Sequence, residues 1–555
     1  MRSRAAALAA IASERFDVLV IGGGITGAGV ALDAASRGYS VALVERADYA
    51  SGTSSRSSKL VHGGLRYLQS FDLGLVREAL LERRLLARLA PHLVVPLPMI
   101  VAAFAGAHPD RLVGIGLNMY DVMAVPLRGR RRGRDAQTDQ SEAAWSPDRH
   151  RVISGEEVSA LLPALAGRRP TGGYLFYDCQ TDDSRLVLTV LGEAERFGAT
   201  CVNRACVEAL RRGSDGVTVI SVRDGVTDER LEVRADNVIN ATGVWADRIV
   251  PGELHAEAEL PQIVPSRGTH VLLDERLLPL RAGAIVPVPD GRSIFALPWL
   301  GRSLVGTTDE TYDGAIEHVR PSGEDVEYLL HAVNEFFGCA LTAGDLAGAY
   351  AGVRPLISSG DSRRSVDISR REELFETSSG MITITGGKLT TWRRMAKLAV
   401  DRLVARDGRQ APCRTHEIPL GAPVDPEHLP RVAGVAEEAY AALAGRYGHA
   451  AADVLALAAA EPSLARPIVD GQPDLLAEAR FAAAREQAGS VGDVLLRRTR
   501  LGLLAARECA GDGGRIARLV AETVAPELGW DDATVASATA AFDEEAAAEG
   551  IMVGA

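Results

Sequence analysis

An apolar strand that runs directly into closely spaced glycines constrains this fold more than any other feature of the sequence. The apolar run 16–21 precedes three consecutive glycines, an alanine-rich helical stretch and a second apolar run that ends at Glu45. In such a unit Gly22 permits a tight turn, Gly24 lets the backbone approach a pyrophosphate, and Gly27 lets helix and strand pack closely. An acid at the end of the second strand accepts hydrogen bonds from a ribose diol. The segment therefore predicts a βαβ unit that binds FAD or NAD rather than NADP.

Length and charge exclude several classes of protein. A chain of 555 residues is too long for one hydrophobic core, and 47% hydrophobic with 24% charged residues excludes a disordered chain. The net charge of -12 argues against nucleic-acid binding, because a phosphate backbone would be repelled on average. A small anionic substrate would therefore need a local cluster of arginines. The six cysteines have no metal-ligand spacing, so we predict no metal site and a reducing compartment.

No apolar run approaches the roughly 18 to 20 residues that a membrane-spanning helix needs. The alanine-rich start, residues 1–16, is short for a signal core, and we expect a helical or frayed leader there. The apolar stretch Arg111 to Ala124 precedes five arginines within residues 128–134. These neighbouring stretches either contact anionic lipid headgroups or form a solvated loop. We therefore expect a protein that is soluble or rests on a membrane surface.

A segment rich in hydroxyl groups and glycines, residues 51–68, favours FAD over NAD. Its hydroxyls and amides offer donors for phosphate and flavin oxygens. Its later half brings four polar or cationic side chains together: Lys59, His62, Arg66 and Tyr67. Strand-to-glycine turns recur at 238–243 and 382–388. At the second of these turns a helix N-terminus would stabilise negative charge near the flavin pyrimidine ring.

Seven segments, in order along the chain, resemble the FAD-dependent glycerol-3-phosphate dehydrogenase family of the respiratory, quinone-linked type. They are IGGGITGAG, SSRSSKLVHGGLRYL, YDCQTDDSRLVL, NATGVWAD, FALPWLGRSLVGTTDE, YAGVRPL and TGGKLTTWR. The resemblance runs from about Phe16 to Leu398 and resumes in the C-terminal helices. It implies an α/β fold: a Rossmann-like, two-dinucleotide-binding-domain flavoprotein of the D-amino-acid-oxidase type. An antiparallel-sheet substrate domain and a C-terminal helical domain would complete it.

This fold class builds its flavin domain from separated pieces. We place the FAD-binding domain at 14–85, 176–254 and 348–405, the substrate domain at 86–175 and 255–347, and the helical domain at 406–555. Strands such as Thr269 to Leu273 and Leu304 to Gly306 should form an antiparallel sheet that covers the substrate. In the last domain, apolar residues at spacings of three and four predict helices at 436–443, 451–460, 475–488 and 491–506. Residues 490–493 are typical of a capping box.

The resemblance implies a reaction and the residues that perform it. The family oxidises the C2 hydroxyl of glycerol 3-phosphate to dihydroxyacetone phosphate, sends the hydride to FAD N5, and passes the electrons to a quinone. By matching positions, Arg354 and Lys388 lie beside the reacting hydroxyl and flavin. Arg66 and Arg370 face the phosphate, for which a planar guanidinium is well suited, and Tyr67 also binds the substrate. Arg371 follows Arg370 directly, so either arginine of this pair can be the ligand.

The base is the least determined residue. His62 is the natural base, since imidazole can take a proton near neutral pH; alternatively its ring hydrogen-bonds the flavin or the backbone. His270 matches a family histidine on a strand, where we expect a structural role. Lys388, after two glycines at a helix start, would stabilise anionic reduced flavin or polarise the C2 oxygen.

The motifs also predict the residues that hold FAD and the partners of the protein. The cofactor contacts are Gly22, Gly24, Gly27, Glu45, Ser54, Ser55, Ser58, Lys59, Ala241, Thr242, Gly243, Gly387, Leu389 and Thr390. The need to reach a membrane quinone implies a cytoplasmic protein, peripheral on the inner face of the cell membrane. The oligomeric state, a homodimer included, stays open.

Three other functions remain compatible with the sequence. An oxidase would pass electrons to oxygen and release peroxide, and no residue separates it from the dehydrogenase. A related flavoenzyme for amino or 2-hydroxy acids needs one carboxylate clamp, whereas several matched cations suit a dianionic phosphate. A non-catalytic FAD-binding scaffold would recruit partners through its helical tail, but Arg354 and Lys388 argue against it.

Overall fold

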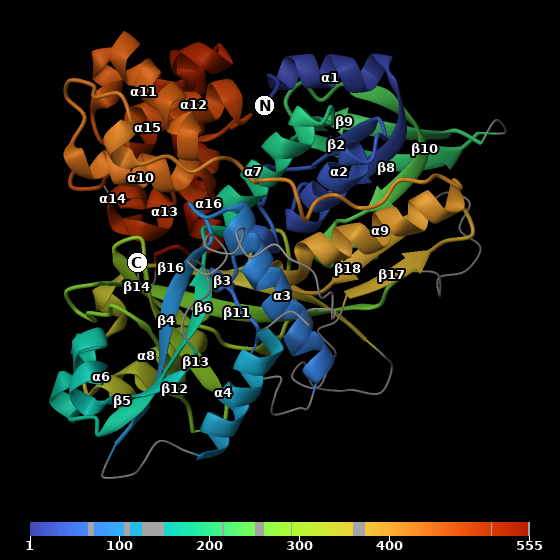
Figure 1. Cartoon of the computed structure of the whole chain (residues 1–555). Helices are drawn as coiled ribbons and strands as arrows, with labels where there is room; N and C mark the ends of the chain where they lie inside the picture. The colour runs from blue at the N-terminus through green and yellow to red at the C-terminus, as the bar shows by residue number, and fades with distance from the viewer. Residues whose placement is uncertain are drawn as a thin grey trace.

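The structure is a computed structural model that describes residues 1–64, 72–104, 111–124, 149–213, 216–249, 260–289, 291–358, 372–511 and 513–552. Two sheets and a lobe of C-terminal helices make up the molecule (Figure 1). The candidate residues Arg66, Tyr67, Arg370 and Arg371, and the arginines of 128–134, lie outside the described residues. Among those that are described, no helix combines the length and the apolar character needed to cross a bilayer.

The first sheet has the order β17-β18-β10-β1-β2-β7. Its parallel strands are β1 (Arg15–Ile21), β2 (Val41–Val44), β7 (Thr200–Val202), β10 (Arg230–Asn240) and β18 (Ile382–Gly386). Antiparallel partners are β8 (Ala205–Arg212), β9 (Thr218–Asp224) and β17 (Glu372–Glu376). The predicted strands 16–21 and 40–44, with the helix between them, are confirmed as β1, β2 and α2 (Ile25–Ser36).

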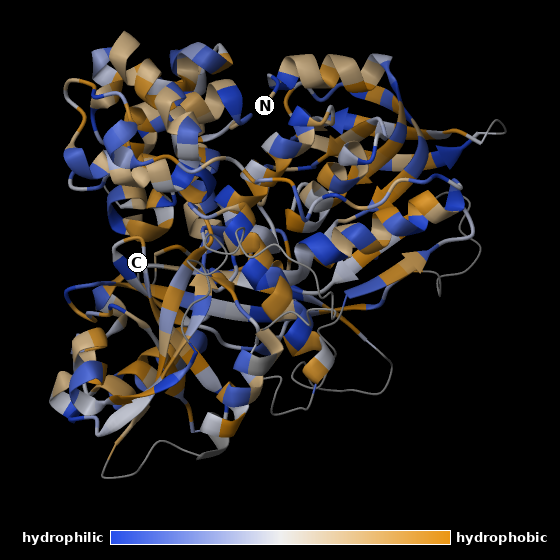
Figure 2. Ribbon diagram, in the orientation of Figure 1, coloured by the Kyte–Doolittle hydropathy of each residue, from blue (hydrophilic) through white to orange (hydrophobic). Residues whose placement is uncertain are grey.

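Both faces of this sheet are covered. The helices α2, α7 (Asp183–Arg196) and α9 (Trp392–Arg406) cover one face, where Val18 and Val20 are fully buried. On the other face Leu19 and Ile21 pack with the first helix, α1 (Arg4–Ser13), and with β8 and β9. Burial on both sides explains why β1 reads as a continuous apolar run rather than an alternating one. Helix α9 carries both orange and blue residues along its length, as expected for one buried face (Figure 2).

The second sheet has the order β15-β11-β14-β13-β12-β4-β6-β3, with β16 beside β11 and β5 beside β6. Its strands are β3 (Leu60–Val61), β4 (Val95–Ala103), β5 (Arg151–Ser154), β6 (Gly172–Gln180), β11 (Ile263–Asp274), β12 (Gly283–Pro287), β13 (Ser293–Trp299), β14 (Arg302–Gly306), β15 (Glu310–Thr311) and β16 (Leu346–Ile357). The predicted strands 269–273 and 304–306 are parts of β11 and β14, which pair antiparallel. The sheet is nevertheless mixed, because β12 and β4 run parallel.

Several helices accompany the second sheet: α3 (Leu73–Leu89), α4 (Arg111–Ala124), α6 (Gly155–Leu161) and α8 (Gly323–Phe337). The strands β6 and β16 each lie entirely within this sheet, whereas the predicted domain limits at 175/176 and 347/348 fall inside them. The pieces that form the two sheets alternate along the chain, as expected for a discontinuous flavin domain.

The C-terminal lobe consists of α10 (Glu437–Tyr447), α11 (Ala451–Ala460), α12 (Leu476–Arg485), α13 (Leu501–Leu504), α14 (Ala506–Ala510), α15 (Arg515–Leu528) and α16 (Asp532–Glu549). The first three predicted helices are confirmed, but 491–506 is not one helix. Residues 493–498 form a π-helical turn, and Arg500 then takes a left-handed φ of 69°. Ser490 caps the Asp493 amide at 3.1 Å, while the Asp493 carboxylate accepts from Gly489 N and completes no capping box.

Candidate active site

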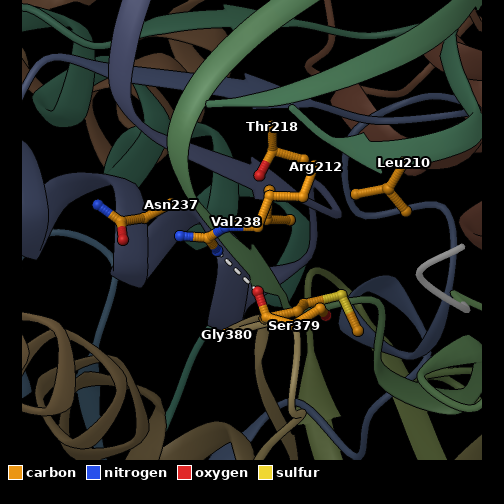
Figure 3. A pocket seen from close by; sticks show the side chains of 8 residues that line it. Leu210, Arg212, Thr218, Asn237, Val238, Ser379 and Gly380 are labelled. Carbon is orange, nitrogen blue, oxygen red and sulfur yellow. Dashed lines mark hydrogen bonds between the residues drawn. The ribbon is translucent and has the colours of Figure 1, made fainter. Parts of the chain in front are cut away.

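A cavity of about 320 Å³ opens at the carboxyl ends of β1, β2 and β10. Ligands of open α/β sheets bind there, where the strand order reverses. The first turn of α2, the loop 50–54 and the turn 384–389 complete its wall. A second hollow, between Arg212 and Ser379, has only about 20 Å³, and the Arg212 guanidinium donates to the Ser379 carbonyl 2.7 Å away (Figure 3). It is too small for a dinucleotide, so the first cavity is the candidate site.

The glycines of the first turn have the conformational roles predicted for them. Gly22 adopts a φ of 112°, and a Cβ there would lie 2.7 Å from the Ala241 carbonyl oxygen. A Cβ on Gly27 would lie 1.9 Å from the Gly22 carbonyl oxygen, so only glycine lets α2 pack this closely on β1. Gly24 lines the cavity as the N-cap of α2.

The N-terminus of α2 favours an anion in the cavity. Gly24 has no side chain to cap the helix, and the first turn contains no acidic residue. Ser54 accepts a hydrogen bond from the Ile25 amide at 2.9 Å and would meet a Cβ on Gly24 at 3.0 Å. The N-terminus of α2, which is the positive end of its helix dipole, therefore lies against the cavity and suits a pyrophosphate.

Glu45 lines the cavity and is already hydrogen-bonded. Its two carboxylate oxygens accept from the Gly23 amide at 2.7 Å and the Ala47 amide at 2.8 Å. Burial raises the pKa of Glu45, although these two hydrogen bonds oppose the rise. Because a carboxylate oxygen can accept more than one hydrogen bond, capacity remains for a ribose diol.

The predicted cofactor residues divide into two groups. Those that line the cavity are Gly22, Gly24, Glu45, Ser54, Ala241, Thr242, Gly243, Gly387 and Leu389. Those that do not line it are Gly27, Ser55, Ser58, Lys59 and Thr390. The second group lies close behind the first and supports it.

Lys59 makes a buried ion pair instead of lining the cavity. Its ammonium, fully buried, donates to both Asp183 carboxylate oxygens at 2.9 Å and to the Ser55 carbonyl at 2.6 Å. The Ser58 hydroxyl lies 2.8 Å from His270 Nε2, and the Ser55 carbonyl is engaged by Lys59. Lys59 and Ser58 therefore join their loop to α7 and β11, which is a structural role.

His62 does not line the cavity itself but is joined to the Lys388 turn, which does. Lys388 lines the cavity as the N-cap of the 3₁₀ turn Leu389–Thr391. Thr390 in that turn accepts from the His62 amide at 3.0 Å and donates to the His62 carbonyl at 3.1 Å, which joins the two segments. Burial lowers the pKa of His62, and Lys388 and Arg83 lower it further against an opposing effect of Asp178. The His62 imidazole is therefore neutral at pH 7.

Arg354 stands beside the cavity wall. Its neighbour Pro355 lines the cavity, and the Thr53 hydroxyl donates to the Val353 carbonyl at 2.6 Å, which ties β16 to the loop 50–54. The Arg354 guanidinium donates to Thr307 Oγ1 at 3.2 Å and pairs with Asp309 at 3.4 Å. Its orientation is thus fixed by the second sheet.

His270 is buried in the same region. Its ring stacks on Tyr350 with centroids 4.8 Å apart. Burial lowers its pKa well below the usual value, and the nearby cations Lys59 and Arg354 act in the same direction. The stacking and the Ser58 contact fit the structural role expected for His270.

The comparisons with known proteins agree with this geometry. Residues 17–402 match the family model described as FAD dependent oxidoreductase, and residues 413–535 match the C-terminal domain of alpha-glycerophosphate oxidase. The chain is 38% identical over 541 residues to glycerol-3-phosphate dehydrogenase 2 of Mycobacterium tuberculosis, covering 96% of this chain and 88% of that protein. The chain belongs to the FAD-dependent glycerol-3-phosphate dehydrogenase family.

Other members and solved structures show how far the likeness extends. Aerobic glycerol-3-phosphate dehydrogenase of Bacillus subtilis is 36% identical over 414 residues, covering 73% of this chain and 71% of that one. The structure of glycerol-3-phosphate dehydrogenase from Bacillus halodurans, complexed with FAD, superposes with a TM-score of 0.77 at 28% identity, covering 100% and 98% of the two chains. The predicted family, fold class and FAD dependence are confirmed.

The residues that line this cavity suit the parts of FAD. The start of α2, whose N-cap glycine has no side chain, suits the pyrophosphate. Glu45 suits the ribose, and the Lys388 turn supplies a cation to the cavity wall. Predictions from sequence missed part of the wall. Trp245, with the Arg46 guanidinium 4.4 Å above its ring, was inside a quoted motif and could have been selected. Residues 205–207 carry no motif, and only the folded β8 brings them to the cavity.

Proposed function

We propose that this protein oxidises sn-glycerol 3-phosphate at C2 to dihydroxyacetone phosphate and passes the electrons to a membrane quinone. The proposal rests on a dinucleotide cavity lined by Lys388. His62 is joined to the Lys388 turn through Thr390, and Arg354 is next to Pro355 of the cavity wall. Relatives that align with nearly the whole chain are named glycerol-3-phosphate dehydrogenases. When bound, FAD supplies the hydride acceptor.

His62 takes the C2 hydroxyl proton in this proposal. A base must be unprotonated at the working pH, and the burial and neighbouring cations that lower its pKa keep the imidazole neutral. The hydrogen bonds between its backbone and Thr390 fix its position relative to Lys388.

Arg354 and Lys388 stabilise negative charge that develops on the C2 oxygen and the cofactor. A guanidinium held by Thr307 and Asp309 needs little reorganisation, and preorganised charge is the larger part of such stabilisation. The family resemblance assigns phosphate binding to Arg66 and to Arg370 or Arg371, and substrate binding to Tyr67; all four lie outside the described residues.

The quinone acceptor implies contact with a membrane surface, and α4 supports such a contact. Ile115 on this helix is 58% exposed, and the arginine-rich stretch follows the helix in the sequence. A peripheral position on the inner face of the cell membrane would bring the flavin site to its acceptor.

Anaerobic titration with glycerol 3-phosphate, followed by flavin absorbance, tests the substrate. We expect full bleaching at about one equivalent; bleaching by an amino or 2-hydroxy acid instead would overturn the proposal. Mixing the reduced enzyme with a soluble quinone or with oxygen then tests the acceptor. Faster reoxidation by oxygen, with stoichiometric peroxide, would replace the dehydrogenase with an oxidase.

A further inference from the structure

Three arginines of the C-terminal lobe are buried against the loop that follows β2 and the start of α7. Arg497, Arg498 and Arg500 are 6%, 0% and 0% exposed, and they follow one another where the predicted helix is broken. A buried guanidinium is unfavourable unless every charge is paired with good geometry. Their partners therefore reveal what this irregular segment is shaped to hold.

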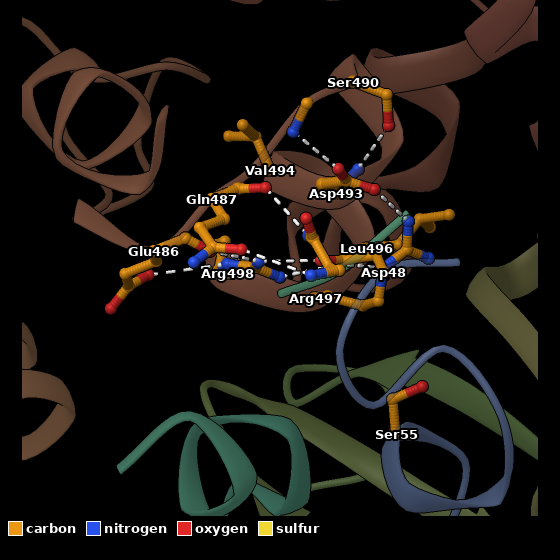
Figure 4. Close-up of polar contacts among 12 residues, drawn as sticks. Asp48, Ser55, Glu486, Gln487, Ser490, Asp493, Val494, Leu496, Arg497 and Arg498 are labelled. Carbon is orange, nitrogen blue, oxygen red and sulfur yellow. Dashed lines mark hydrogen bonds and ion pairs between the residues drawn. The ribbon is translucent and has the colours of Figure 1, made fainter. Parts of the chain in front are cut away.

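Two of these arginines hold one aspartate (Figure 4). Arg498 binds Asp48 through both nitrogens of its fork, at 2.7 and 2.8 Å, and Arg497 Nε adds a third contact at 2.7 Å. Asp48 is 2% exposed and follows Glu45 by three residues. It belongs to the segment 45–59, which we call the cavity loop.

Arg500 holds the other end of the same loop. It donates to the Ser55 carbonyl at 2.9 Å and to Asp183 Oδ1 at 2.7 Å. Lys59 donates to the same carbonyl and the same carboxylate. The cations Lys59 and Arg500 and the anion Asp183 therefore hold this end of the loop together. Although burial raises it, pairing with Lys59 and Arg500 leaves the pKa of the Asp183 carboxyl below its usual range.

The part of the loop between these anchors forms the cavity wall. Residues 50–54 line the cavity, and Ser54 accepts the hydrogen bond from the Ile25 amide at the start of α2. The loop has little regular structure of its own, since only Thr53–Ser55 form a 3₁₀ turn. Ala50 and Lys59 adopt left-handed φ values of 62° and 60°, which residues with a Cβ rarely adopt without outside support.

We propose that Arg498 and Arg500 are positioning residues of the flavin site. Through Asp48 and Ser55 they fix the cavity loop, so that the C-terminal lobe sets the affinity of the first sheet for FAD. This inference rests on the proposed function only for its cofactor and not for its substrate. It assigns a specific task to a lobe that contributes no residue to the cavity wall among those described.

The test compares three single variants of the full-length protein: Arg498→Met, Arg500→Met and the control Arg446→Met. Arg446 is also buried and pairs with Asp474 and Glu478, but all three belong to the C-terminal lobe. Each protein is stripped of flavin and titrated with FAD at a temperature where all three are folded. Hydrogen exchange is measured on peptides covering 46–58 in the flavin-free state.

We expect the FAD dissociation constant to rise about tenfold or more in Arg498→Met and Arg500→Met, a coupling of ordinary size between two sites. Exchange in the cavity loop should accelerate in both, whereas the control should match the parent in both measurements. Equal FAD affinity and equal loop exchange in all three variants would overturn the proposal.

A second set of variants covers the case in which Arg500→Met does not fold. Asp48→Asn removes the loop-side charge and Arg498→Lys keeps the charge but not the fork; both should weaken FAD binding. If Arg498 acts through Asp48, the double variant Asp48→Asn with Arg498→Met should cost less than the sum of the two singles. If the effects of the two single variants on FAD binding simply add, Arg498 does not act through Asp48.

The outcome is separable from that of the proposed function. If the parent protein binds FAD but glycerol 3-phosphate does not bleach it, the substrate assignment fails while the affinities above still test the anchors. If bleaching is normal and the anchor variants bind FAD as tightly as the parent, only the present inference fails.

Discussion

The dinucleotide side and the substrate side of the cavity are built in different ways. On the dinucleotide side, α2 and Glu45 come from one short stretch of chain, and their backbone contacts follow from the glycines between them. On the substrate side, Lys388, His62 and Arg354 come from three distant segments of the chain. Thr390 joins the His62 and Lys388 segments by two hydrogen bonds, and Thr307 and Asp309 hold Arg354. A local sequence motif is therefore enough to form the dinucleotide-binding turn. The positions of the reactive residues depend instead on how the two sheets pack.

The largest effect should follow from Gly27→Ala, which disrupts the dinucleotide-binding turn. The added Cβ would lie 1.9 Å from the Gly22 carbonyl oxygen, so α2 must move off β1. We expect the free energy of unfolding to fall by about 2–3 kcal/mol and FAD to be lost on purification. Urea unfolding and the flavin-to-protein ratio measure these effects. The control Gly192→Ala, where a Cβ meets nothing within 4 Å, should stabilise α7 slightly.

On the substrate side, Arg354→Lys should leave FAD binding intact and slow flavin reduction on the order of 10³-fold. A point charge cannot reproduce the fork held by Thr307 and Asp309. Stopped-flow reduction under anaerobic conditions measures the rate. Arg302→Lys, in the same sheet but paired with Asp274, should reduce at the parent rate. An unchanged rate in Arg354→Lys would remove this arginine from the reactive geometry.

His62→Asn should slow reduction by about 10²-fold and change its pH dependence. In the parent, protonation of His62 at acid pH removes the base, and its lowered pKa places this loss below pH 6.5. The reduction rate should therefore be flat above neutrality and fall on the acid side. His62→Asn should lack the acid limb, and the half-buried control His92→Asn should keep it. Retention of the limb in His62→Asn would assign the proton to another group.

The smallest effect should come from Glu78 on α3, near Lys388. Burial, with Glu372 close by, raises the pKa of Glu78 to about 7. Between pH 4.5 and pH 7 the Glu78 carboxyl therefore keeps a proton in the folded state that it loses in the unfolded state. The free energy of unfolding consequently falls as the pH rises through this window. Glu78→Gln should gain stability relative to the parent between pH 5 and pH 8, by at most about 1 kcal/mol because the group is half-exposed. Urea unfolding at both pH values tests this, with exposed Glu275→Gln as the unaffected control.

The same contrast explains what the sequence could and could not predict. The turn at Gly22 and the packing at Gly27 were predictable because each depends on contacts within the βαβ unit or just beside it. The role of Lys59 was not, because its partner Asp183 lies on α7, more than a hundred residues away. Likewise the apolar spacing of 491–506 predicts a helix, but the structure breaks it where Arg498 and Arg500 reach Asp48 and Ser55.

The central claim is that this cavity oxidises glycerol 3-phosphate with FAD, and anaerobic titration of the purified holoenzyme tests it most directly. Glycerol 3-phosphate should bleach the flavin absorbance completely at about one equivalent, with dihydroxyacetone phosphate formed in equal amount. A flavin that stays oxidised with excess glycerol 3-phosphate, while an amino or 2-hydroxy acid reduces it, would contradict this function.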